Sequence, residues 1–167
     1  MNNNLQKISN FEDKSLLIVD DDNPFRDRLS RAMEKKGFSV SQAEGVKKGI
    51  DLIKLKKPAF AVVDLRLADG NGLEIVKELQ VSNKSCKIIM LTGYGNIPTA
   101  VAAIKQGAID YLAKPADADD VEKALLADPA KKLNHLKIQC RQIELSGNIY
   151  IEFLNFVIEM FLKLQED

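Results

Sequence analysis

The chain has few cysteines and histidines for its length. Its two cysteines, Cys86 and Cys140, are too few for a disulfide framework and fit a reducing compartment. Its single histidine, His135, lies near the C-terminus. Neither a histidine metal site nor a Ser/His/Asp triad is therefore available to the main part of the chain.

The chain also lacks an excess of charge of either sign. Its 24 Lys and Arg residues balance 24 Asp and Glu residues, so no overall field would draw it to nucleic acid or to an anionic membrane. The N-terminal stretch MNNNLQKISNFEDK has no apolar segment behind a basic one, and thus no sign of a secretory signal. A length of 167 residues suits one domain with an appendage. We predict a cytoplasmic protein with no membrane association.

Short apolar runs alternate five times with segments of helical periodicity, up to about residue 127. The runs predict strands near 15–20, 38–41, 59–64, 87–91 and 109–112, and the segments between them predict helices at 24–36, 45–56, 72–81, 97–106 and 118–127. Strict alternation predicts an α/β fold with a five-stranded parallel sheet and helices on both faces, the doubly wound, flavodoxin-like (βα)5 arrangement.

Polar side chains close four of these apolar runs. An acidic cluster at 20–22 follows the first run, Asp64 the third, Thr92 the fourth and Lys114 the fifth. Because parallel strands deliver their ends to one edge of a sheet, we expect these groups to meet there, where ligands bind in open α/β sheets.

Carboxylates from two strand ends repel one another unless a cation lies between them. Ligands that are all oxygens favour Mg²⁺, which also accepts phosphate oxygens. Asp64 beside such a cation would stay ionised and could act as a nucleophile that forms an acyl phosphate. Lys114 would place positive charge on the transferring phosphoryl group, and Thr92 would hydrogen-bond the product oxygen. These residues predict phosphoryl transfer onto Asp64.

Several polar or reactive residues also have purely structural interpretations. Asp22, just before Pro24, is better explained as a helix cap. Tyr111 in a strand is more often a core residue than a switch, and Cys86 is better explained by packing than by redox chemistry. The functional interpretation depends on the combination, since four separate strand ends carry the required groups.

The motifs IVDD, VVDLRLADGNGL, IIMLTGYG and GAIDYLAKP together resemble the receiver domain of two-component response regulators, over residues 14–127. The longer stretches IVDDDNPFRDRLSRAMEKKGF and DYLAKPADADDVEKALLA are similar to the redox-responsive regulators called RegA, PrrA or ActR. The resemblance implies a phosphoacceptor signalling protein, not an enzyme, that controls transcription after a sensor histidine kinase phosphorylates Asp64. It also implies possible homodimer formation on phosphorylation.

The resemblance further implies roles for individual residues. Asp21, Asp64 and the backbone carbonyl of Arg66 would bind Mg²⁺, with Asp20 acting mainly through water. Thr92 and Tyr111 would form a switch pair, and Lys114 would be the cation that senses the phosphate.

The C-terminal part departs from this family. Residues 128–132 suggest a linker, but 133–167 carry three basic residues against five acidic ones, whereas a DNA-reading helix-turn-helix needs the opposite balance. Reading the codons of this tail one base earlier permits a string that resembles the family's linker and the start of its DNA-binding domain. We predict an out-of-frame remnant of that domain; the alternative is a genuine helix for dimerisation or for a protein partner. DNA binding is expected of the intact family but not of this chain.

Other functions remain open from the residues alone. A stand-alone receiver would act through protein contacts or as a phosphate sink. A haloacid dehalogenase-type phosphatase would need a second carboxylate two residues after Asp64, where Arg66 stands instead. A flavodoxin-like cofactor binder shares the expected topology, but topology alone does not decide function.

Overall fold

The computed structural model describes residues 7–93 and 103–127. The chain divides into two compact units, residues 1–126 and 127–167. The predicted linker 128–132 and tail 133–167 therefore lie outside the described residues. So does most of the predicted helix 97–106, of which residues 103–105 are helical.

The strands form the predicted five-stranded parallel sheet, in the order β2-β1-β3-β6-β7. Each strand lies within two residues of its expected start and end. The strands are β1 (Ser15–Val19), β2 (Ser39–Ala43), β3 (Phe60–Asp64), β6 (Lys87–Thr92) and β7 (Asp110–Ala113). The α/β prediction is confirmed.

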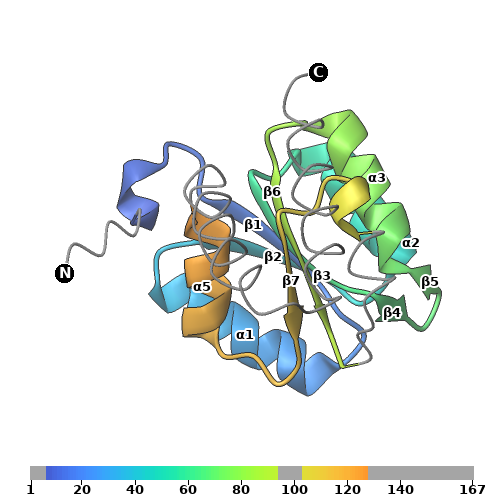
Figure 1. Ribbon diagram of the computed structural model, residues 1–167, viewed down its shortest axis with the longest axis horizontal. Helices are drawn as coiled ribbons and strands as arrows, with labels where there is room; N and C mark the ends of the chain where they lie inside the picture. Colours follow the sequence, from blue (N-terminus) through green and yellow to red (C-terminus); the bar gives the residue numbers. More distant parts are fainter. Residues whose placement is uncertain (1–6, 94–102, 128–167) are drawn as a thin grey trace, which may run out of the picture. The chain divides into compact units, whose positions relative to one another are not determined.

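Helices cover both faces of the sheet (Figure 1). Two of them, α1 (Asn23–Lys35) and α5 (Ala118–Leu126), pack on one face, and α2 (Val46–Lys56) and α3 (Gly72–Ser82) pack on the other. A short 3₁₀ helix, η1 (Ile8–Asn10), joins the α1 and α5 face. No helix in the described part of the chain has the length and apolar character needed to cross a membrane.

The strands separate two hydrophobic cores because successive side chains point to opposite faces. In β1, Leu16 and Ile18 pack under α1 and α5, whereas Leu17 and Val19 pack under α2 and α3. All four side chains are at most 1% exposed. A strand buried on both faces has no need of polar alternation, which explains the continuous apolar run.

A small hairpin, which the sequence did not predict, interrupts the connection between β3 and α3. Its strands, β4 (Arg66–Leu67) and β5 (Gly70–Asn71), pair antiparallel. The hairpin begins two residues after Asp64 and ends at Asn71, immediately before the first residue of α3. It therefore lies directly beside the edge of the sheet where polar groups were expected to gather.

Candidate functional site

Two aspartates meet at the carboxyl edge of the sheet because their strands are in register. Val19 of β1 pairs with Val63 of β3, so Asp20 and Asp64 each follow the same pair. Asp20 is 2% exposed and Asp64 is 8% exposed. One carboxylate oxygen from each of Asp20, Asp21 and Asp64 lies within 4.8 Å of the others. The structure thus brings these three carboxylates together.

Lys114 connects the two buried aspartates. Its Nζ atom lies 2.6 Å from Asp20 Oδ2 and 2.9 Å from Asp64 Oδ2. Lys114 follows β7, at the same edge of the sheet, and its peptide bond to Pro115 is cis. The ring of Phe25, on α1, lies under the ammonium group with its centroid 4.5 Å from Nζ. A cation placed between two carboxylates can later neutralise charge on a bound phosphoryl group.

Burial and neighbouring charges act in opposite directions on the pKa values of Asp20 and Lys114. Burial raises the pKa of the Asp20 carboxyl, although hydrogen bonds from Lys114 and from the Asp22 amide partly offset the effect. Burial also acts to lower the pKa of Lys114, but its hydrogen bonds to Asp20 and Asp64 outweigh burial, and the pKa is raised. Lys114 is therefore held in its charged form.

The carboxylate set fits a hard divalent cation. Asp64 Oδ1 is buried and has no hydrogen-bond partner among the described residues, which is unusual for a carboxylate oxygen unless another ligand uses it. The cluster offers only oxygen atoms, the ligands that Mg²⁺ prefers. Asp20, Asp21 and Asp64 are the side chains that would hold it.

The chain turns sharply after Asp64. The Gly72 amide donates to the Leu65 carbonyl at 2.8 Å, which closes the base of the hairpin. A Cβ atom at Gly72 would lie 2.0 Å from the Asp64 carbonyl oxygen, so only glycine permits this approach. The hairpin also contains Arg66, whose backbone carbonyl was expected to serve as a metal ligand.

The expected switch residues lie on the two strands beyond β3. Thr92 is the last residue of β6 and pairs with Ala113, but its side chain is outside the described part of the structure. Tyr111, on β7, packs against the core under α2 and α3, and its buried hydroxyl has no partner among the described residues. Burial and then the nearby Asp64 charge raise its pKa. Tyr111 thus belongs partly to the core and partly to the surroundings of the site.

The structural interpretations of two residues are confirmed. Asp22 caps α1 by accepting a hydrogen bond from the Phe25 amide. Cys86 is buried, and burial raises the pKa of its thiol to about 12. A protonated buried thiol is a packing residue and a poor redox centre.

Sequence reasoning missed three residues that shape the site. Phe25, at the start of α1, lies against Lys114. Arg26 donates to the Asp20 carbonyl through Nη1 and to Gln42 Oε1 through Nε, which joins the start of α1 to β2. Asp69 binds two amides of α2. No local pattern signals these contacts, because each joins separate elements.

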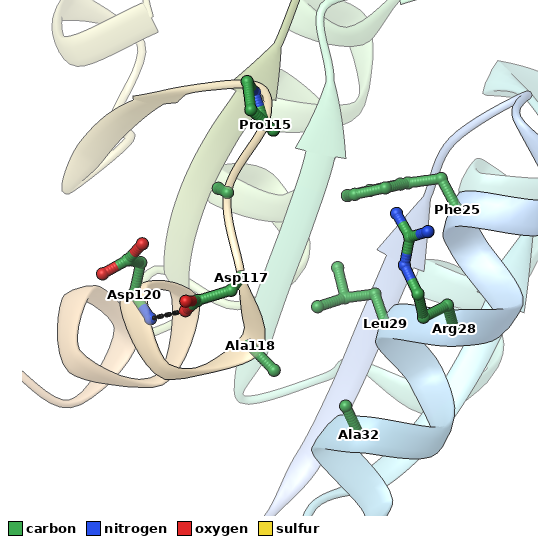
Figure 2. A pocket seen from close by; sticks show the side chains of 9 residues that line it. Phe25, Arg28, Leu29, Ala32, Pro115, Asp117, Ala118 and Asp120 are labelled. Carbon is green, nitrogen blue, oxygen red and sulfur yellow. Dashed lines mark hydrogen bonds between the residues drawn. The ribbon is translucent and has the colours of Figure 1, made fainter.

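An open groove of about 460 Å³ lies next to the site, between α1 and the segment that follows Lys114. Figure 2 shows Phe25 and Leu29 on the α1 wall and Pro115 and Ala118 on the other wall. Asp117 on that wall accepts a hydrogen bond from the Asp120 amide at the start of α5. Phe25 therefore forms part of both the groove and the surroundings of Lys114.

Known proteins share this fold and these motifs. The response regulator receiver domain family matches residues 16–126. The chain is 58% identical over 115 residues to the photosynthetic apparatus regulatory protein RegA of Rhodobacter capsulatus, a match that covers 69% of this chain and 62% of RegA. It is 54% identical over 121 residues to the acid tolerance regulatory protein ActR of Rhizobium meliloti, covering 72% of this chain and 62% of ActR.

A solved structure supports the same assignment. It is a response regulator from Burkholderia pseudomallei with a phosphorylated aspartic acid, a calcium ion and citrate, with a TM-score of 0.70 and 29% identity. The match covers 90% of this chain and 97% of that one. The chain spans 62% of the length of the curated relatives described above. From its sequence match, its sheet order and its acidic edge, the chain belongs to the response regulator receiver domain family, whose members are phosphoacceptor signalling modules.

Proposed function

We propose that Asp64 accepts a phosphoryl group from a sensor histidine kinase, with Mg²⁺ held by Asp21, Asp64 and the Arg66 carbonyl and with Asp20 acting mainly through water. The observation that carries the proposal is the state of the Asp64 carboxylate. Lys114 binds Oδ2, while Oδ1 is buried and unpartnered among the described residues. One oxygen is thus held by a cation and the other is available for chemistry.

In the transfer, an Asp64 carboxylate oxygen attacks phosphorus and forms a new O–P bond. The P–N bond to the donor histidine breaks, and the leaving nitrogen keeps the electron pair. When bound, Mg²⁺ supplies positive charge to the phosphoryl oxygens. Lys114, already charged and 2.9 Å from Asp64 Oδ2, can follow the charge onto the new phosphoryl group.

The response to phosphorylation would involve Thr92 and Tyr111. In this proposal Thr92 moves toward the phosphoryl oxygen and Tyr111 turns into the space that Thr92 vacates, so the added charge biases a two-state surface. The raised pKa of Tyr111 keeps its hydroxyl protonated and able to donate a hydrogen bond. Homodimer formation would be one output of this change.

The wider role proposed for this chain is transcriptional regulation, since RegA and ActR are named as regulatory proteins. The DNA-binding part of such regulators would have to lie outside the matched residues 16–126. We therefore propose control of transcription for the intact architecture and not for the receiver unit alone.

Phosphorylation with a small phosphodonor tests the assignment. Purified protein incubated with acetyl phosphate and Mg²⁺ should gain one phosphoryl group by intact-mass spectrometry, and Asp64→Asn should gain none because the amide is not a nucleophile. Asp13→Asn serves as a control, because Asp13 lies before β1 and, among the described residues, its side chain accepts a local hydrogen bond from the Ser15 amide. Uptake by Asp64→Asn at the wild-type rate would overturn the assignment.

A further inference from the structure

The hairpin β4–β5 is fastened to α2 by one carboxylate. Asp69, in the turn of the hairpin, accepts hydrogen bonds from the Val46 amide through Oδ1 at 2.8 Å and from the Lys47 amide through Oδ2 at 3.1 Å. These amides belong to the first turn of α2, where backbone donors have no partner within the helix. The same hydrogen bonds lower the pKa of Asp69, so the carboxylate stays charged near neutral pH.

Gly45 makes room for this contact. It occupies the N-cap position of α2, where a serine or aspartate would ordinarily supply the cap, and it offers no side-chain bond. A Cβ atom at Gly45 would lie 2.4 Å from Asp69 Oδ1. The backbone at Gly45 is extended, with φ −170° and ψ −177°, so its conformation does not require glycine. Glycine is required because the Asp69 carboxylate occupies the space that a Cβ atom would need.

The hairpin is consequently held at both ends. The bond from the Gly72 amide to the Leu65 carbonyl closes its base, next to Asp64. At its far end Asp69 binds α2, and Gly70 lies so near Val46 that an added Cβ would come within 3.0 Å of its side chain. Arg66 lies between these two anchors.

We propose that Asp69 is a positioning residue for the phosphoacceptor site: by binding α2 it fixes the segment that presents the Arg66 carbonyl, an inference that rests on the function proposed above. Asp69 is not one of the three clustered carboxylates, Asp20, Asp21 and Asp64. Its effect is on the affinity for the cation, because a displaced backbone carbonyl is a lost ligand.

A double variant separates this role from simple helix capping. In Asp69→Ala the cap and the tether are both lost. In Asp69→Ala with Gly45→Ser, the new serine has room and caps α2 locally, but the hairpin stays untethered. We would measure thermal unfolding, Mg²⁺ binding by isothermal titration calorimetry, and the rate of labelling by acetyl phosphate against Mg²⁺ concentration, all on the full chain.

We expect Asp69→Ala to unfold at a lower temperature and to bind Mg²⁺ about ten-fold more weakly. The double variant should recover the unfolding temperature and keep the weak Mg²⁺ binding. Asp13→Ala also loses a carboxylate bond to a backbone amide, but before β1, at the opposite edge of the sheet, and should bind Mg²⁺ like the wild type.

Wild-type Mg²⁺ affinity in Asp69→Ala, or recovery of affinity together with stability in the double variant, would overturn the inference and reduce Asp69 to a helix cap. Absence of Mg²⁺ binding and of labelling in the wild type itself would instead overturn the proposed function, and the inference with it. The two failures are therefore distinguishable.

Discussion

Burial of the charged Asp20 carboxylate lowers the stability of the folded protein. Its carboxylate is 2% exposed, and burial raises its pKa above the ordinary value of 3.8. A group whose pKa is raised on folding destabilises the folded protein while it is ionised. The penalty is present at neutral pH and disappears as the pH falls through the folded pKa to below the unfolded value.

Replacing Asp20 by asparagine should relieve this penalty. In the absence of divalent cations we expect Asp20→Asn to unfold at a higher temperature than the wild type at pH 7, because a neutral amide is cheaper to bury than a carboxylate. The difference should shrink as the pH falls through the folded pKa of Asp20, because the carboxyl of the wild type then becomes neutral as well. Differential scanning calorimetry at several pH values measures both effects.

A stability difference that stayed constant over this pH range would show that charge is not the cause. Mg²⁺ should raise the unfolding temperature of the wild type more than that of Asp20→Asn, because the variant has lost one of the clustered carboxylates. The charge of Asp20 thus lowers the stability of the protein without Mg²⁺ and strengthens the binding of Mg²⁺.

At the scale of the element, α1 depends on Asp22 for its start. Asp22 caps the helix through the Phe25 amide at 3.0 Å, and Pro24 occupies the first turn. The same helix places Phe25 beside Lys114 and Arg26 against the Asp20 carbonyl. The geometry of the site therefore depends on where α1 begins.

We expect Asp22→Ala to lower the free energy of unfolding by about 1 kcal/mol relative to Asp22→Asn. The two variants remove the same charge, but asparagine can still accept the hydrogen bond from the Phe25 amide. Urea denaturation followed by circular dichroism gives both values. Equal stability of the two variants would mean that the cap contributes nothing.

The same scale shows what the sequence could and could not predict. The strands were predicted closely because a buried parallel strand is a continuous apolar run, and the meeting of Asp20 with Asp64 followed from strand ends alone. The β4–β5 hairpin was missed because two-residue strands have no periodicity.

The contacts of Phe25, Arg26 and Asp69 were missed for another reason. Each joins elements that are far apart in the chain, and the partner of each is fixed only when the helices pack.

At the scale of the whole molecule, the receiver unit ends where the family match ends, at residue 126. The tail from 133 to 167 stays a proposal, as an out-of-frame remnant of a helix-turn-helix domain. Lys131 and Lys132 can be encoded by a run of adenines, where a base is easily gained or lost.

Resequencing the DNA from the codon of Lys131 to the stop codon tests this proposal. We expect the frame one base earlier to encode a proline-rich linker and then a basic helix-turn-helix. If that frame encodes nothing of this kind, the proposal is wrong and the tail is a genuine element. Dimerisation would then become its leading function.

The pairing of Val19 with Val63 has a consequence for how such a protein can change over generations. One residue inserted into β1 or β3 would advance an aspartate by about 3.3 Å and exchange the side chains that face the two cores. The same accident would thus disable the site and the fold together. Insertions and deletions can therefore accumulate only in the connections between strands and helices. The carboxylates at this edge and the packing of the two cores must be retained together.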